Sequence, residues 1–172
     1  MILFNLHNIN VLNTILTPDG RCIVVDIEFH GSKYHLVNAY FSNDDDEKKS
    51  FILSLYPLVS SQYPTIFGGD FNLTMNAMID RYPSNSSNDL HSSDLRDLVN
   101  TFDLQDVCRK IYPVKPFFSF RRGLSKSRID LFYISKNCIF DNYQHQDFPL
   151  SDHDIVSTTI ATQNTKLKGK EF

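Results

Sequence analysis

Apolar and polar residues alternate through most of the first forty positions, which is the pattern of half-buried β-strands. Apolar runs at residues 1–6 and 11–16 precede a turn signal at 17–20 (TPDG), and a β-branched, alternating segment follows at 21–29. This order predicts a β-hairpin centred on residues 17–20. Residues 33–41 form a further predicted strand. One face of that strand carries Tyr34, Leu36, Asn38 and Tyr40.

Two segments have the spacing of amphipathic helices. The first follows the acidic residues 43–47, and we expect Pro57 to kink or end it. Its apolar positions are Phe51, Ile52, Leu55, Leu58 and Val59. The second follows a polar, turn-rich loop at 83–93, with Ser92 or Ser93 as the predicted N-cap. Its apolar positions are Leu95, Leu98, Val99 and Phe102.

The remaining apolar runs predict further short strands. One lies at 65–70, where an apolar run ends in two glycines, and the others lie at 117–120, 128–134, about 139–144 and 154–161. Many strands with two helices between them predict one α/β sandwich domain over residues 1–162. We expect two mostly antiparallel β-sheets packed face to face with flanking helices, followed by a polar tail at 163–172.

Composition is that of an ordinary globular domain: 172 residues, 41% hydrophobic and 22% charged, with a formal net charge of −3. The three cysteines, Cys22, Cys108 and Cys138, are widely spaced and odd in number, which predicts reduced thiols. No apolar run approaches the length of a membrane span, and no secretion signal is recognisable. We therefore expect an intracellular protein, nuclear or cytoplasmic, with no membrane partner.

The stretch TIFGGDFNL at residues 65–73 carries the first candidate chemistry. Asp70 and Asn72 are two residues apart and present neighbouring oxygen atoms, the ligands that Mg²⁺ prefers. Gly68 and Gly69 remove side-chain bulk just before them and permit a close approach. The alternative interpretation is a strand that ends in a glycine turn capped by Asx hydrogen bonds.

Further candidate residues follow along the chain. His153 lies in the string LSDH and can contact phosphate as a cation or move a proton. Asp152-His153-Asp154 could also be a loop that caps a strand. Asp130 alternates with Arg128 and Phe132 and could be half of a surface ion pair, and Tyr40 could be a core aromatic residue with a satisfied hydroxyl.

One long stretch is basic and contains no acid. Between Val107 and Ile129 lie Arg109, Lys110, Lys115, Arg121, Arg122, Lys126 and Arg128. The interleaved aromatic residues are Tyr112, Phe117, Phe118 and Phe120. Such a stretch can contact phosphates and stack on unpaired bases. Alternatively, the aromatic rings face inward and the basic residues form a solvated loop; we favour nucleic-acid contact for Arg121, Arg122 and Lys126.

These strings together resemble the endonuclease/exonuclease/phosphatase superfamily. The string GGDFN resembles its central motif, SRID at 127–130 resembles its S-x-I-D element, and SDH at 151–153 resembles its closing motif. Residues 36–40 resemble the strand that ends in the family tyrosine. Asp80-Arg81 and residues 98–106 are similar to the branch found in LINE-type non-LTR retrotransposons.

The resemblance implies an endonuclease that nicks DNA with Mg²⁺ or Mn²⁺, and a reverse transcriptase domain in the parent protein. The implied catalytic residues are Tyr40, Asp70, Asn72, Asp130 and His153, with Asp130 orienting the imidazole. The implied metal ligands are Asp70 and Asp152. The implied substrate contacts are Arg81, Ser119, Arg121, Arg122, Lys126 and Ser127, and residues 121–126 match the hairpin loop that contacts DNA in the retrotransposon enzymes.

The chain departs from the family at its beginning. The strand asparagine and the glutamate of the Q-E-T string are not found, and Glu28 lies in the wrong context. We therefore expect the sequence to begin several dozen residues into the domain and the endonuclease to be impaired or inactive. The alternatives are a non-catalytic remnant that binds nucleic acid and a phosphatase for a small phosphorylated substrate. Asp80-Arg81 and the basic hairpin favour DNA.

Overall fold

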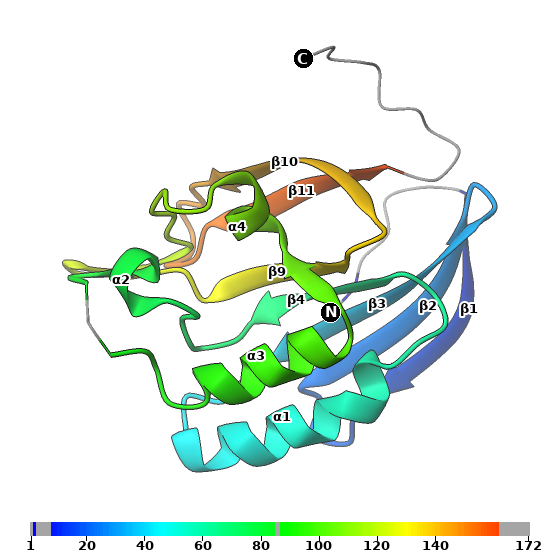
Figure 1. The fold of residues 1–172 in the computed structure, drawn as a ribbon, viewed down its shortest axis with the longest axis horizontal. Helices are drawn as coiled ribbons and strands as arrows, with labels where there is room; N and C mark the ends of the chain where they lie inside the picture. The colour runs from blue at the N-terminus through cyan, green and yellow to red at the C-terminus, as the bar shows by residue number, and fades with distance from the viewer. Residues whose placement is uncertain (1, 3–7, 85–86, 162–172) are drawn as a thin grey trace.

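A six-stranded sheet forms the centre of the molecule, with the strand order β1–β2–β3–β4–β9–β6 (Figure 1). The computed structural model describes residues 2, 8–84 and 87–161. The strands are β1 (Ile9–Leu16), β2 (Cys22–Phe29), β3 (Ser32–Tyr40), β4 (Thr65–Asp70), β6 (Leu104–Asp106) and β9 (Asp130–Ser135). Neighbouring strands pair antiparallel except β3 and β4, which are parallel.

The predicted hairpin is confirmed, because β1 and β2 pair across the turn at residues 17–20. Gly20 has a φ of +70° there, a conformation that glycine adopts without steric cost. The apolar run predicted at 1–6 lies outside the described residues except for Ile2, and so does the polar tail at 163–172.

Two helices, α1 (Asp45–Val59) and α3 (Ser92–Thr101), cover one face of this sheet (Figure 1). The main core lies between them and the sheet, and it includes Ile52, Leu98, Phe67 and Leu131. Pro57 does not end α1 where it stands, since the helix continues to Val59.

The N-cap predicted for the second helix is wrong. The cap residue is His91, in the left-handed conformation with a φ of 66°, and it makes no side-chain cap hydrogen bond. The imidazole of His91 instead lies 2.7 Å from the carboxylate of Asp94. Ser92 is buried in the first turn, so its hydroxyl does not perform the capping role that composition suggested.

A two-stranded sheet packs on the other face, which gives the predicted sandwich. It consists of β10 (Ile139–Gln146) and β11 (Ile155–Ala161), and α4 (Val107–Ile111) adjoins it. Tyr143 and Ile134 are buried in a second core between the layers. No helix within the described ranges is long and apolar enough to cross a membrane.

A third, small sheet was not predicted. It contains β5 (Arg81–Tyr82), β8 (Ser125–Ser127) and β7 (Phe120–Arg122), and α2 (Ala77–Asp80) directly precedes β5. The strand expected at 117–120 begins only at Phe120. Strands of two or three residues are too short to produce a recognisable alternation.

Candidate active site

Three neighbouring strands bring their polar residues to one edge of the central sheet. Tyr40 and Asp70 are paired across the parallel strands β3 and β4. Asp70 is also paired with Asp130, the first residue of the antiparallel strand β9. The two carboxylates therefore lie side by side, although they are sixty residues apart in the chain.

The two glycines before Asp70 permit this pairing because they let neighbouring backbones come close. A Cβ atom on Gly69 would lie 1.9 Å from the carbonyl oxygen of Ala39 in β3. Gly69 also has a φ of +144°, which other residues rarely adopt. A Cβ on Gly68 would lie 3.2 Å from the carbonyl oxygen of Leu131 in β9. Gly69 is therefore required by the sheet itself, whereas a side chain at Gly68 would need its neighbour to shift by a few tenths of an ångström.

Asn72 holds the end of β4 in place. Its backbone N–H donates to Asp70 Oδ1 over 3.0 Å, and its Nδ2 donates to the carbonyl oxygen of Phe41 over 2.8 Å. The residue has a φ of +44°, a conformation that asparagine tolerates better than most residues. The Asx hydrogen bond of the alternative interpretation is therefore present, and it orients the Asp70 carboxylate.

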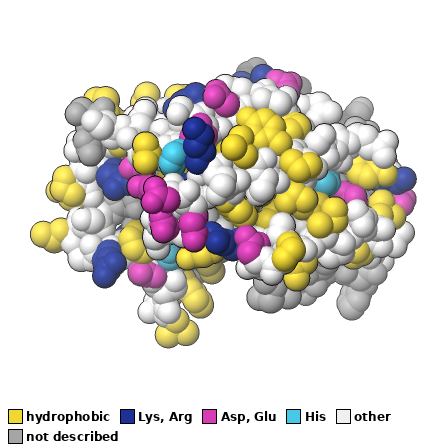
Figure 2. Space-filling view, turned by 90° about the horizontal axis from the view of Figure 1, so that it is seen from below, with side chains coloured by type: hydrophobic (Ala, Val, Ile, Leu, Met, Phe, Trp, Pro, Cys, Tyr) yellow, Lys and Arg dark blue, Asp and Glu magenta, His cyan; other side chains and the backbone are white. Residues whose placement is uncertain are grey.

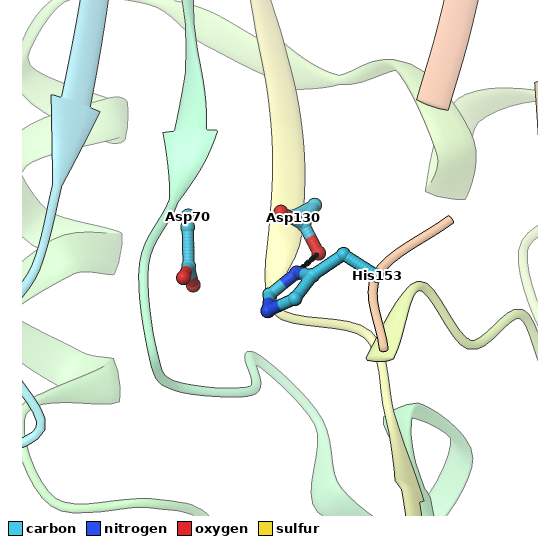
Figure 3. A group of neighbouring side chains, drawn as sticks. All are labelled: Asp70, Asp130 and His153. Atoms are coloured by element: carbon cyan, nitrogen blue, oxygen red, sulfur yellow. Dashed lines mark hydrogen bonds and ion pairs between the residues drawn. The ribbon is translucent and has the colours of Figure 1, made fainter. Parts of the chain in front are cut away.

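His153 reaches the same place from the loop before β11. Its Nδ1 lies 2.9 Å from Asp130 Oδ2, the partner that the family resemblance implied. Figure 3 shows the Asp70 carboxylate and the His153 ring facing the same space, with Asp130 behind the ring. Ligand atoms of Asp70, Asp130 and His153 all lie within 4.8 Å of one another.

The electrostatics of this group differ from those of a surface cluster. Burial raises the pKa of Asp70 to about 6, the hydrogen bond from Asn72 opposes the shift, and the negative charge of Asp130 adds to it. Burial alone would lower the pKa of His153, but the hydrogen bond and charge of Asp130 outweigh it, so this pKa is raised. The site favours a positive charge on His153 and has an excess of negative charge around Asp70.

A cavity of about 500 Å³ adjoins the site. Tyr40, Asp70 and Asp130 line its polar end. Its apolar lining comes from the sheet and from β11, and includes Leu36, Ile66, Phe132 and Val156. Tyr40 is 50% exposed and lines the cavity, so the residue is not a core aromatic.

Comparisons with known proteins agree with this arrangement. The sequence model of the Endonuclease/Exonuclease/phosphatase family matches residues 6–153. The chain belongs to the endonuclease/exonuclease/phosphatase family.

Among its relatives, the transposon TX1 uncharacterized 149 kDa protein of Xenopus laevis is 32% identical over 161 residues. These cover 88% of this chain but only 12% of that protein. The solved endonuclease domain of TRAS1, a telomere-specific non-LTR retrotransposon, superposes with a TM-score of 0.66 at 20% identity, covering 93% of this chain and 72% of that one. An AP endonuclease from Archaeoglobus fulgidus superposes with a TM-score of 0.69 at 16% identity, and the match covers 89% of this chain and 72% of that one. The two superpositions show the family fold.

Asp152, the second metal ligand implied by the family motif, lies slightly apart from the other acids. It is exposed and does not belong to the group formed by Asp70, Asp130 and His153. Its charge still raises the pKa of both Asp70 and His153. Asp152 therefore contributes negative potential at the mouth of the site.

Sequence reasoning missed a buried ion cluster behind the family motif SRID. Arg128 is 0% exposed, and its guanidinium donates to Asp80 over 2.7 Å and to Asp106 over 2.8 Å. Arg109 also pairs with Asp80. Arg109 and Arg128 bind carboxylates of this cluster, so the nucleic-acid interpretation of the basic stretch is wrong for these two residues. The signal that could have found the cluster is Asp80 and Asp106, two acids in segments already singled out by the family resemblance.

The hairpin expected at 121–126 exists as β7 and β8, and its exposed basic residues differ in their ion pairs. Arg122 is exposed in the edge strand β7, and Lys126 is exposed in the central strand β8. Arg121 pairs with the buried carboxylate of Asp154. Ser127 is half-buried opposite Arg81 in the strand pairing.

Two other predicted substrate contacts have protein partners. Ser119 is fully buried, and its hydroxyl accepts hydrogen bonds from the N–H groups of Ile129 and Asp130 over 3.2 and 3.0 Å. It therefore supports the start of β9 and does not face the solvent. Arg81 forms an ion pair with Asp89 at 2.6 Å.

The aromatic residues of the basic stretch face largely inward. Tyr112 and Phe117 pack on the second core, and the ring of Phe117 contacts that of Tyr143. The ring of Phe120 lies 4.9 Å from the ring of His153. This supports the inward-facing alternative for Tyr112 and Phe117 and connects Phe120 to the site.

Proposed function

We propose that this site hydrolyses phosphodiester bonds in DNA with a divalent cation, as the nicking endonuclease of a LINE-type retrotransposon. The observation that carries the proposal is the convergence of Asp70, Asp130 and His153 within 4.8 Å at one sheet edge. Membership of the endonuclease/exonuclease/phosphatase family supports phosphate ester hydrolysis as the chemistry.

The residues fit a hard divalent cation. Two carboxylates face one space, and their mutual repulsion contributes to the raised pKa of Asp70. A cation held by Asp70 and Asp130, with Asp152 nearby, would relieve that repulsion. We propose Mg²⁺ or Mn²⁺. When bound, the ion polarises a phosphate oxygen and neutralises charge on the phosphate.

The protein side chains supply the proton transfers and the orientation. The N–H of Asn72 holds the Asp70 carboxylate in a fixed orientation, from which it can accept a hydrogen bond from the attacking water. Asp130 fixes the imidazole of His153 through Nδ1, and the other ring nitrogen points toward the Asp70 side (Figure 3). That nitrogen is placed to donate to a phosphate oxygen, and the half-exposed Tyr40 can donate a second hydrogen bond.

Local charge supports DNA as the substrate. On the side of α1 and α3, acidic and basic side chains lie next to one another and form no continuous basic patch (Figure 2). The exposed Arg122 and Lys126 stand on the hairpin whose first strand contacts His153. Phosphates bound there would be close to the site. The likeness to a transposon protein and to a retrotransposon endonuclease domain supports the same substrate and a reverse transcriptase domain in the parent protein.

The test is plasmid nicking by the 172-residue chain with Mg²⁺, beside Asp70→Ala and His153→Ala variants. Because the family glutamate is not found in this sequence, we expect the unsubstituted chain to produce relaxed circles only slowly, and either variant to produce about a hundredfold fewer. A chain that binds the plasmid but does not nick it at saturating Mg²⁺ would replace this proposal with the nucleic-acid-binding remnant.

A further inference from the structure

The segment that carries His153 is paired with the first strand of the hairpin. The N–H of Asp154 donates to the carbonyl oxygen of Ser119 over 2.7 Å, and the N–H of Arg121 donates to the carbonyl oxygen of Asp152 over 2.9 Å. Between these two bonds, Phe120 and His153 form an antiparallel bridge. Residues 119–121 and 152–154 therefore make a short ladder with His153 at its centre.

The ion pair between Arg121 and Asp154 joins the side chains across this ladder. The Asp154 side chain is only 3% exposed, so its charge requires a close cation. His145 is a weak candidate: its Nδ1 is 3.7 Å from Asp154 Oδ2 and only 3.0 Å from the carbonyl oxygen of Phe118, and burial lowers the pKa of its imidazole. Arg121 hydrogen-bonds Asp154 directly, and this bond raises the pKa of the guanidinium. Arg121 is thus the cation that neutralises Asp154.

We propose that Arg121 and Asp154 are positioning residues for His153. The ion pair between Arg121 and Asp154 holds the hairpin against residues 152–154 and thereby fixes the imidazole of His153 beside Asp130. The catalytic consequence rests on the proposed phosphodiesterase function. The proposal changes the role predicted for Arg121: although its side chain is 43% exposed, its guanidinium is bound to a protein carboxylate, whereas the exposed side chain of Arg122 is open to phosphate.

The closing experiment compares neighbouring arginines in the full chain. Ring resonances of His153 are recorded by NMR for the unsubstituted chain, Arg121→Ala, Arg121→Lys and Arg122→Ala, and DNA affinity is measured against salt concentration. We expect Arg121→Ala to move the His153 resonances and to leave the salt dependence of binding unchanged. Arg121→Lys should restore the resonances. Arg122→Ala should leave the resonances in place and reduce the salt slope by about 0.9.

Kinetics provide a second, separate readout. We expect Arg121→Ala to lower kcat about tenfold with little change in KM, because the imidazole is misplaced while the phosphate contacts remain. Arg122→Ala should chiefly raise KM. If the unsubstituted chain nicks no DNA, the proposed function fails, but the NMR comparison still decides the positioning role.

The positioning role is overturned if Arg121→Ala leaves the His153 resonances unmoved or reduces the salt slope as Arg122→Ala does. Circular dichroism establishes that each variant is folded. If Arg121→Ala unfolds, Asp154→Asn decides by the same NMR readout, because it removes the charge and keeps an oxygen that Arg121 can bind. Unmoved His153 resonances in that variant also overturn the proposal.

Discussion

Replacing Arg128 with methionine should strongly destabilise the domain. Methionine keeps much of the side-chain length but removes a guanidinium that is fully buried between Asp80 and Asp106. The side chain of Asp80 is 0% exposed and keeps Arg109 and the N–H of Asn76 as partners. The side chain of Asp106 is 14% exposed and loses the cation that Arg128 supplied. Breaking a buried ion pair from one side costs about 3–5 kcal/mol.

That cost is a large part of a domain stability of roughly 5–15 kcal/mol. For a chain of this length, 1 kcal/mol corresponds to roughly 2–4 °C in Tm, so we expect Tm to fall by about 6–20 °C. Urea denaturation gives the free energy of unfolding directly. Lys126→Met is the matched control, because Lys126 is exposed in the same basic stretch, and it should change stability by at most about 0.5 kcal/mol.

A second substitution tests the cause of the loss. Asp106→Asn added to Arg128→Met removes the carboxylate that the first change left unpaired, so the double variant should recover part of the stability. A loss below about 1 kcal/mol for Arg128→Met, or a double variant less stable than the single one, would refute the reasoning from uncompensated buried charge.

Three further predictions concern the site. The pKa of Asp70 is raised from 3.8 to about 6 in the folded chain. The folded state therefore binds a proton more tightly than the unfolded state, and the free energy of unfolding falls as pH rises from about 4 through 6. Asp70→Asn should be more stable than the unsubstituted chain in urea melts at pH 7.5, with this advantage lost at pH 4. Gly69→Ala should lower the free energy of unfolding by roughly 3 kcal/mol or more, because its Cβ would lie 1.9 Å from a backbone oxygen. Gly20→Ala should lower it by only about 1–2 kcal/mol, because a Cβ there would have nothing within 4 Å. Thermal melts of both variants check this contrast. Ser119→Ala should destabilise by about 1–3 kcal/mol and loosen Asp130, because two buried N–H groups lose their acceptor; faster amide hydrogen exchange at Asp130 is the measurement, and unchanged exchange would contradict it.

Local patterns in the sequence were sufficient to predict the long helices and strands and to identify the site motifs in their order. The hairpin at 17–20, both helices and the strand before the two glycines depend on neighbouring residues alone, because their periodicity or turn chemistry is local. Short elements were not predicted, because a strand of two residues such as β5 has no periodicity to recognise. The capping error at His91 arose because a cap depends on backbone conformation, which composition does not define.

Tertiary structure alone decided which charges face the solvent and which are buried. In the sequence, Arg121, Arg122 and Arg128 are equivalent members of one basic stretch. In the fold, Arg128 meets Asp80, 48 residues away, and Asp106, 22 residues away, and Arg121 meets Asp154, 33 residues away. The Arg121 side chain is still 43% exposed, and the fold buries the Asp154 carboxylate that it neutralises, whereas Arg122 is simply exposed. A charged side chain is buried only where a distant opposite charge compensates its lost hydration, and only the folded chain brings those partners together.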